Sequence, residues 1–193
     1  MLWEEDFEKM TERWGRYLDV DDDGIPYRSI PGNRNSKSAY FARGTGHDDY
    51  AAYTEKPDDW EKNMARLVLK FKTAQEYLPS PVIKQKEGAK IGMIAFGSTE
   101  SAIAEAQDIL ESKNVPADFL RIKALPLTDS VKEFIESHDT VYVVELNRDG
   151  QMHQILTVEY PKLTEKMVSL TKHNGYSLSA EWVVSELLKK EQE

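Results

Sequence analysis

The chain has 193 residues, and its 40% hydrophobic and 31% charged residues are typical of globular proteins. The net charge of −9 argues against a nucleic-acid partner, because phosphate binding requires clustered Lys and Arg side chains. The sequence contains no cysteine, so the chain itself offers no disulfide, no thiol nucleophile and no Cys-ligated iron–sulfur cluster.

The sequence gives no indication of a membrane segment. No apolar run approaches the roughly 20 residues that a helix needs to cross a bilayer. The first residues, Met1 to Asp6, are acidic, whereas a secretory signal begins with basic residues and continues with apolar ones. We therefore expect a cytoplasmic protein that does not contact a membrane.

The N-terminal segment is predicted to be a helix followed by a long irregular arm. Apolar side chains recur there at helical spacing: Trp3, Phe7, Met10 and Trp14. Gly15 is expected to end this helix. Residues 15–56 are rich in Gly, Asp, Asn, Ser and Arg and have no sustained periodicity. A stretch this long without regular structure is usually functional or covered by a partner, so we expect Trp3, Phe7 and Trp14 to be exposed in this N-terminal part of the chain.

A second helix is predicted from Asp58. Its acidic first turn suits the positive end of a helix dipole, and the prolines after residue 78 end it. Its apolar stripe consists of Met64, Leu67, Val68, Phe71 and Ala74. Residues 84–88 are expected to form a linker, which divides the chain into residues 1–87 and 88–193.

Strands and helices alternate after this linker. The predicted strands are residues 91–96, 118–122, 141–146 and 167–171, with helices between them and after the last one. Thr128 and Ser179 are the expected caps of two of these helices. This order predicts an α/β domain with a mainly parallel sheet, flanking helices and right-handed crossovers.

Residues 19–24 match the opening of a calcium-binding loop, with acidic side chains at alternate positions before a glycine. The twelfth position of such a loop should be a bidentate Glu, but here it is Ile30. Two interpretations remain: an ordinary acidic turn, or a weak cation site with an incomplete ligand set. The ligand count favours the turn, and we predict no metal site.

The densest group of chemically capable side chains is Arg43, Gly44, Thr45, Gly46, His47 and Asp48. The glycines allow backbone amides to approach an anion, Arg43 suits a carboxylate or phosphate, and His47 exchanges protons near neutral pH. The alternative is a Gly-rich turn in which His47 and Asp48 bond to nearby backbone. Two glycines and one histidine are a weak signal, so the residues alone favour the turn.

Phe96 to Thr99 follows the first of the regular strands and leads into a helix. This is the edge of a parallel sheet where ligands usually bind. Capping of the helix by Ser98 or Thr99 explains the same residues equally well.

Glu145, Asn147 and Gln151 follow the third of these strands, at the same predicted edge. Asn and Gln are neither acids nor bases at neutral pH, so we expect the three residues to serve assembly or loop structure rather than proton transfer. The simpler alternative is a turn at Asn147 and Gly150, with Gln151 opening the next helix.

No complete catalytic centre is predicted. His138, His153 and His173 have no metal-ligand spacing, and isolated histidines are usually structural or exposed. The sequence has no Ser-His-Asp order and no nucleophile elbow.

Several segments, taken in chain order, resemble the α subunit of 2-oxoacid:ferredoxin oxidoreductases. They are residues 23–28 (DGIPYR), 39–48 (AYFARGTGHD) with Tyr50, 94–99 (IAFGST), 121–126 (RIKALP) and 143–151 (VVELNRDGQ). The similarity runs over nearly the whole chain, and the set is more specific than any one segment.

The resemblance implies an enzyme that decarboxylates a 2-oxoacid on thiamine diphosphate, passes electrons to ferredoxin and forms an acyl-CoA. It leaves 2-oxoglutarate, pyruvate and branched-chain substrates open. It also implies that residues 1–87 are the tail of a pyrimidine-binding domain with a linker, and that residues 88–193 are a transketolase C-terminal-like domain.

The resemblance implies that a β subunit is the partner of this chain. That subunit is expected to hold thiamine diphosphate, magnesium and an iron–sulfur cluster, so the present chain binds no cofactor alone. Ferredoxin and coenzyme A are partners at the level of the complex, and a dimer of heterodimers is one expected assembly.

Two parts of the family have no counterpart in this sequence. They are the Tyr-Pro-Ile-Thr-Pro-type segment, which contacts the 2-oxoacid in the family, and the γ-type module. No residue is therefore carried over as catalytic, and we expect the chain alone to be inactive. Residues 43–48 are expected near the active-site entrance or a subunit interface. A fragment, a truncated reading frame and a split subunit all remain open. The alternative function is an independent α/β assembly or partner-docking module without catalysis.

Overall fold

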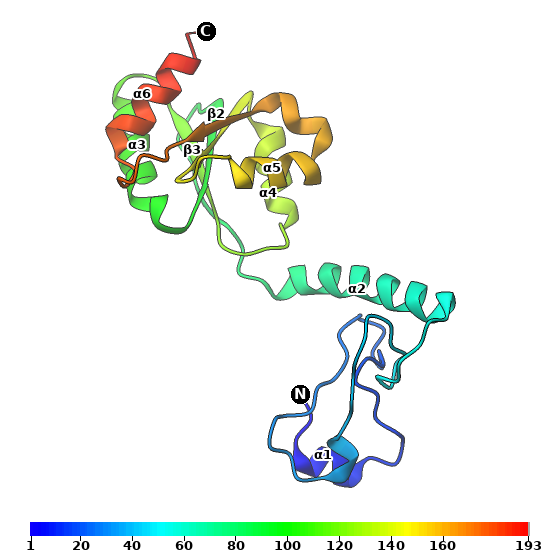
Figure 1. Cartoon of the computed structure of the whole chain (residues 1–193). Coiled ribbons are helices and arrows are strands. Elements are labelled where there is room, and N and C mark those ends of the chain that lie inside the picture. Colours follow the sequence, from blue (N-terminus) through cyan, green and yellow to red (C-terminus); the bar gives the residue numbers. More distant parts are fainter. Residues whose placement is uncertain (193) are drawn as a thin grey trace. The chain divides into compact units, whose positions relative to one another are not determined.

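The computed structural model describes residues 1–192 and divides the chain into two compact units, Met1–Tyr77 and Leu78–Glu193 (Figure 1). The division precedes the expected boundary at residues 87–88. The reason is strand β1 (Val82–Lys84), which pairs antiparallel with β3 and so belongs to the sheet of the second unit. A strand of three residues at a sheet edge has no alternation long enough to be recognised in the sequence.

The first unit begins with a short helix, α1 (Glu4–Lys9), and not with the longer helix that was predicted. Met10 already has extended backbone, and Trp14 returns from the following loop to pack edge-to-face on Phe7, with ring centroids 5.4 Å apart. Trp14 makes a second such contact with Tyr40 at 5.5 Å. Phe7 is fully buried by this packing, which corrects the expectation that it is exposed.

The irregular arm is held by bonds between side chains and backbone. The short 3-10 helix η1 (Ser36–Ser38) carries Lys37, whose Nζ donates hydrogen bonds to the carbonyl oxygens of Phe7 at 3.2 Å and Met10 at 2.9 Å. These carbonyls lie at the C-terminal end of α1, where a cation is favoured by the unpaired C=O groups.

Helix α2 (Pro57–Tyr77) follows the arm, as predicted, and is the longest helix of the chain at 21 residues. Two of its side chains bond to the acidic turn: Thr73 Oγ1 donates to the carbonyl of Asp23 at 2.5 Å, and Arg66 Nη1 donates to that of Gly24 at 3.1 Å. The expected apolar stripe is only partly covered within this unit. Leu67 is half-buried, but Val68 and Phe71 are 72% and 58% exposed.

The second unit is an α/β domain, as predicted. Its five strands lie in the order β1-β3-β2-β4-β5, and all pairings other than that of β1 are parallel. The strands are β2 (Ile91–Phe96), β3 (Ala117–Ile122), β4 (Thr140–Glu145) and β5 (Met167–Thr171). The helical elements are η2 (Gly97–Thr99), α3 (Glu100–Ser112), α4 (Asp129–Ser137), α5 (Gln151–Glu159), η3 (Pro161–Lys166) and α6 (Ala180–Lys190).

Helices cover both faces of this sheet (Figure 1). Alternate side chains of β2 separate the two cores: Met93 packs with α3 and α6, whereas Ile94 packs with α4 and α5. Gly92 faces α4, where an added Cβ would lie 2.7 Å from the ring of Phe134. Ser179 caps α6 through the N–H of Trp182 at 3.4 Å, whereas the expected cap Thr128 makes no side-chain capping bond.

The carboxyl ends of β2 and β4 lie beside each other. The chain leaves β2 toward β3 on one side and leaves β4 toward β5 on the other, so the strand order reverses between them. Such a reversal point is the usual ligand-binding crevice of open α/β sheets.

Within residues 1–192, no helix has both the length and the apolar character of a membrane span.

Candidate functional site

Residues 46–54 form a small hairpin in the first unit. His47 pairs with Tyr53 in an antiparallel bridge, and Thr54 N–H donates to the carbonyl of Gly46 at 3.2 Å. The carboxylate of Asp48 closes the turn by accepting the backbone N–H groups of Tyr50 and Ala52, both at 2.9 Å. An added Cβ at Gly46 would lie 2.3 Å from the carbonyl oxygen of Thr54, so this position requires glycine.

His47 is fixed on both sides. Its ring stacks on Tyr17 with centroids 3.7 Å apart and an interplanar angle of 12°. Its Nδ1 lies 3.3 Å from Asn63 Nδ2 on α2, and the other end of that amide, Oδ1, accepts a hydrogen bond from Arg66 at 2.7 Å. Because the amide N–H₂ faces Nδ1, Nδ1 is the acceptor, and the neutral ring carries its proton on Nε2.

The structure thus brings Gly46, His47 and Asp48 together but leaves Arg43 and Thr45 exposed beside them. Gly44 has a φ of +78° and lies against the ring of Tyr53. The sequence prediction contains neither the partners of His47, which are Tyr17 and Asn63, nor Arg66, which donates a hydrogen bond to Asn63. They lie far from His47 along the chain, so no local spacing could have indicated them.

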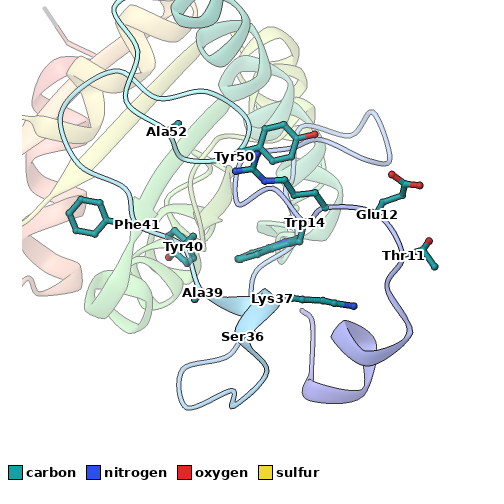
Figure 2. A pocket seen from close by; sticks show the side chains of 11 residues that line it. Thr11, Glu12, Trp14, Ser36, Lys37, Ala39, Tyr40, Phe41, Tyr50 and Ala52 are labelled. Carbon is teal, nitrogen blue, oxygen red and sulfur yellow. The ribbon is translucent and has the colours of Figure 1, made fainter.

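An aromatic hollow of about 640 Å³ lies beside this hairpin (Figure 2). Trp14 and Tyr40 line it side by side, and Tyr50 lies beneath the guanidinium of Arg13 at 4.3 Å. Phe41 at its rim is 77% exposed. An open aromatic surface of this kind is typical of a face that a ligand or another protein covers.

Glu145 ends β4 and is completely buried on the α5 face of the sheet. Its carboxylate accepts hydrogen bonds from Met152 N–H at 2.7 Å, His153 N–H at 2.9 Å and Asn147 Nδ2 at 2.8 Å. The first two donors belong to the first turn of α5, whose N–H groups have no partner within the helix. The carboxylate of Glu145 therefore accepts N–H groups that would otherwise be unpaired at the start of α5. Because the side chain is completely buried, neither of its oxygens faces an open cavity.

Asn147 forms the turn between β4 and α5. Its Oδ1 accepts the backbone N–H groups of Asp149 at 3.1 Å, Gly150 at 2.8 Å and Gln151 at 3.3 Å. Gln151 is the first residue of α5, and its side chain is exposed. Glu145 and Asn147 are thus joined in one hydrogen-bonded loop, while Gln151 contributes through its backbone.

At the end of β2, Thr99 Oγ1 donates to the carbonyl of Phe96 at 2.8 Å and makes no capping bond to α3. The expected capping role of Thr99 is therefore wrong, because a 3-10 turn at residues 97–99 precedes the helix. Gly97 and Ser98 are exposed at this edge.

The acidic turn at residues 19–24 binds its own backbone. Asp19 accepts the N–H groups of Asp23 at 3.2 Å and Gly24 at 2.8 Å, and Asp23 accepts that of Ile25 at 2.7 Å. No group of three or more His, Cys, Asp or Glu side chains within residues 1–192 is placed to hold a metal ion. A chain without cysteine does not fit a Cys-ligated cluster.

His138 lies in the core of the second unit. Its Nε2 lies 3.1 Å from the carboxylate of Asp118, and its Nδ1 lies 2.6 Å from the carbonyl of Phe134. Asp118 also accepts the N–H of Lys86 at 2.7 Å, so this buried pair joins α4, β3 and the segment after β1.

Comparison with known proteins finds relatives that extend over most of this chain. No family model matches the chain. The α subunit of 2-oxoacid:ferredoxin oxidoreductase 2 from Aeropyrum pernix is 30% identical over 186 residues, which are 92% of this chain and 28% of that subunit. The 2-oxoacid:ferredoxin oxidoreductase subunit alpha from Saccharolobus solfataricus is 25% identical over 118 residues, which are 58% of this chain and 19% of the relative.

The fold also matches a solved structure, that of 2-oxoglutarate:ferredoxin oxidoreductase from Magnetococcus marinus with 2-oxoglutarate, coenzyme A and succinyl-CoA bound. The TM-score is 0.78 at 22% identity, and the match covers 94% of this chain and 31% of the other. The chain therefore spans less than a third of the length of these three proteins. It is related, over most of its own length, to the α subunits of 2-oxoacid:ferredoxin oxidoreductases.

Proposed function

We propose that this chain is the α-subunit portion of a 2-oxoacid:ferredoxin oxidoreductase, which decarboxylates a 2-oxoacid oxidatively to an acyl-CoA and passes the electrons to ferredoxin. The observation that carries the proposal is the 30% identity to an α subunit along 92% of this chain. The order of the matched segments, from the DGIPYR turn to the VVELNRDGQ loop, supports the same assignment.

In this proposal the chain works only together with other polypeptides. A β subunit holds thiamine diphosphate, magnesium and the iron–sulfur cluster, and the complex is cytoplasmic. Residues 1–87 correspond to the tail of a pyrimidine-binding domain together with the linker after it, and residues 88–193 correspond to a transketolase C-terminal-like domain. The absence of cysteine supports this division of labour, because electron transfer through a Cys-ligated cluster then requires another chain.

Exposed apolar side chains support an assembly. Val68 and Phe71 on α2 and Phe41 beside the aromatic hollow are more than half exposed. We place residues 43–48 at the subunit interface or the entrance to the active site, with Arg43 presented to a partner and His47 held in one orientation. We assign Glu145, Asn147 and Gln151 to the structure of the β4–α5 loop.

The same exposed surfaces favour a second candidate, an α/β docking module without catalysis. The two candidates differ in whether 2-oxoacid oxidation depends on the chain. A docking module would leave that activity of its cells unchanged when the chain is removed.

The isolated chain is expected to show no 2-oxoacid oxidation, because a chain without cysteine has no Cys-ligated cluster to accept the electrons. The measurement is reduction of a viologen dye by purified chain supplied with 2-oxoglutarate or pyruvate, thiamine diphosphate, magnesium and coenzyme A. A complete oxidoreductase from another source serves as the positive control. Formation of acyl-CoA by the chain alone would show that the division of labour is wrong.

A further inference from the structure

A second cavity of the first unit is strongly basic, in a chain whose net charge is −9. Its volume is about 310 Å³, and four of its eight lining residues are cationic: Arg16, Arg28, Arg66 and Lys70. We call this cavity the basic pocket. It lies apart from the aromatic hollow and shares no lining residue with it.

The four cations converge from separate parts of the chain. Arg16 and Arg28 lie on the irregular arm, and Arg66 and Lys70 lie one turn apart on α2. Among residues 1–192, none of the four has a carboxylate within ion-pair distance, 4.0 Å, although other Lys and Arg side chains of the chain form such pairs. Four like charges around one cavity repel one another, and an anion between them would relieve that repulsion.

Arg66 is fixed at the wall of the basic pocket by its bonds to Gly24 and Asn63. Burial lowers the pKa of Arg66, the charge of Asp19 partly offsets this, and the charge of Arg16 lowers the pKa further. The guanidinium remains protonated at neutral pH. The positive charges of Arg16 and Arg66 therefore repel each other in a partly buried environment.

The acidic groups whose charges act on Arg66 are already engaged. Asp19 accepts backbone N–H groups of its own turn, and Asp49 forms an ion pair with Lys62. The ring of Tyr17, the buried Pro26 and the half-buried Leu67 provide the apolar part of the lining. Apolar walls beside cations strengthen the attraction for an anion that enters.

We propose that the basic pocket binds a small molecule through a diphosphate group. Three of the cations are arginines, whose planar fork matches phosphate oxygens in a bidentate manner. The cavity is within the size range of small-molecule sites and is larger than a single phosphate ion needs. The diphosphate belongs either to free pyrophosphate or to a nucleoside diphosphate, which share the chemistry that the four cations recognise.

The test is calorimetric titration of the full chain with pyrophosphate, ADP, inorganic phosphate and succinate at physiological ionic strength. Saturable binding of pyrophosphate or ADP is expected, with phosphate and succinate weaker by about tenfold or more, because each of these two ions forms fewer charge-assisted bonds with the four cations. Tighter binding of ADP identifies a nucleoside diphosphate as the source, and equal binding identifies recognition of the diphosphate alone.

Two substitutions remove a cation without touching the bonds that fix Arg66. Arg28→Gln and Lys70→Gln are each expected to weaken pyrophosphate binding about tenfold. Lys72→Gln is the matched control, because it removes the same charge from α2 at a residue that does not line the pocket. Absence of saturable binding, succinate binding as tight as that of pyrophosphate, or equal weakening by Lys72→Gln would each overturn the proposal. The test requires no oxidoreductase activity, so its outcome is separate from that of the proposed function.

Discussion

Gly24→Ala is expected to destabilise the first unit by about 4 kcal/mol, which is close to the whole stability of a small unit. Gly24 has a φ of +79°, in the left-handed region that favours glycine. An added Cβ would lie 2.3 Å from the amide nitrogen of Lys70 and 2.8 Å from the carbonyl oxygen of Arg66. Both are backbone atoms of α2, which are held by the helix and have no room to move away.

Gly32→Ala is the matched control for this substitution. Gly32 also has a positive φ, +88°, but no atom lies within 4 Å of the added Cβ. Only backbone strain remains, which costs about 1 kcal/mol. Urea unfolding followed by tryptophan fluorescence checks the difference, because three of the four tryptophans, Trp3, Trp14 and Trp60, lie in the first unit. Equal shifts for the two variants would contradict the close approach of the acidic turn to α2.

Glu145→Ala is expected to destabilise the second unit by about 3–5 kcal/mol. The substitution leaves the N–H groups of Met152 and His153 and the side-chain amide of Asn147 without their acceptor. Because Glu145 is completely buried, water does not replace the lost carboxylate there. Gln151→Ala is the control, because that side chain is exposed on the same loop, and it should change the stability by less than about 0.5 kcal/mol. Thermal unfolding followed by far-UV circular dichroism measures both effects.

Glu145→Gln separates a structural role from a catalytic one. The amide keeps the shape of the side chain and one acceptor oxygen, so we expect a smaller loss of stability and unchanged turnover in the assembled complex. If turnover collapses while thermal stability and subunit association stay unchanged, Glu145 is catalytic and our assignment is wrong.

The sheet of the second unit was predictable because its strands are short, largely apolar segments that alternate with helices and turn residues. Ile91–Phe96 and Met167–Thr171 have the predicted bounds. Strand β3 begins one residue before its predicted start, and β4 is shifted by one residue toward the N-terminus at both ends. Strand β1 was not predicted because it is an edge strand of only three residues, which is too short to show an alternating pattern.

The first unit was less predictable, because tertiary contacts decide its local structure. Trp14 has the right spacing for a helix with Phe7, yet it reaches Phe7 from a loop and also contacts Tyr40. His47 was identified as chemically capable, but its contacts with Tyr17 and Asn63 depend on how the arm folds against α2. Periodicity and local turn chemistry contain no information on such distant pairs.

The most direct test of the central claim is the activity of the complex that this chain forms in its own cells. A tag on the chain should purify a complex that reduces ferredoxin only when a 2-oxoacid and coenzyme A are both present. Iron analysis and the absorption of the iron–sulfur cluster should assign the cluster to a partner chain. Purification of the tagged chain by itself, from cells whose 2-oxoacid:ferredoxin oxidoreductase activity persists when this chain is deleted, would contradict the account.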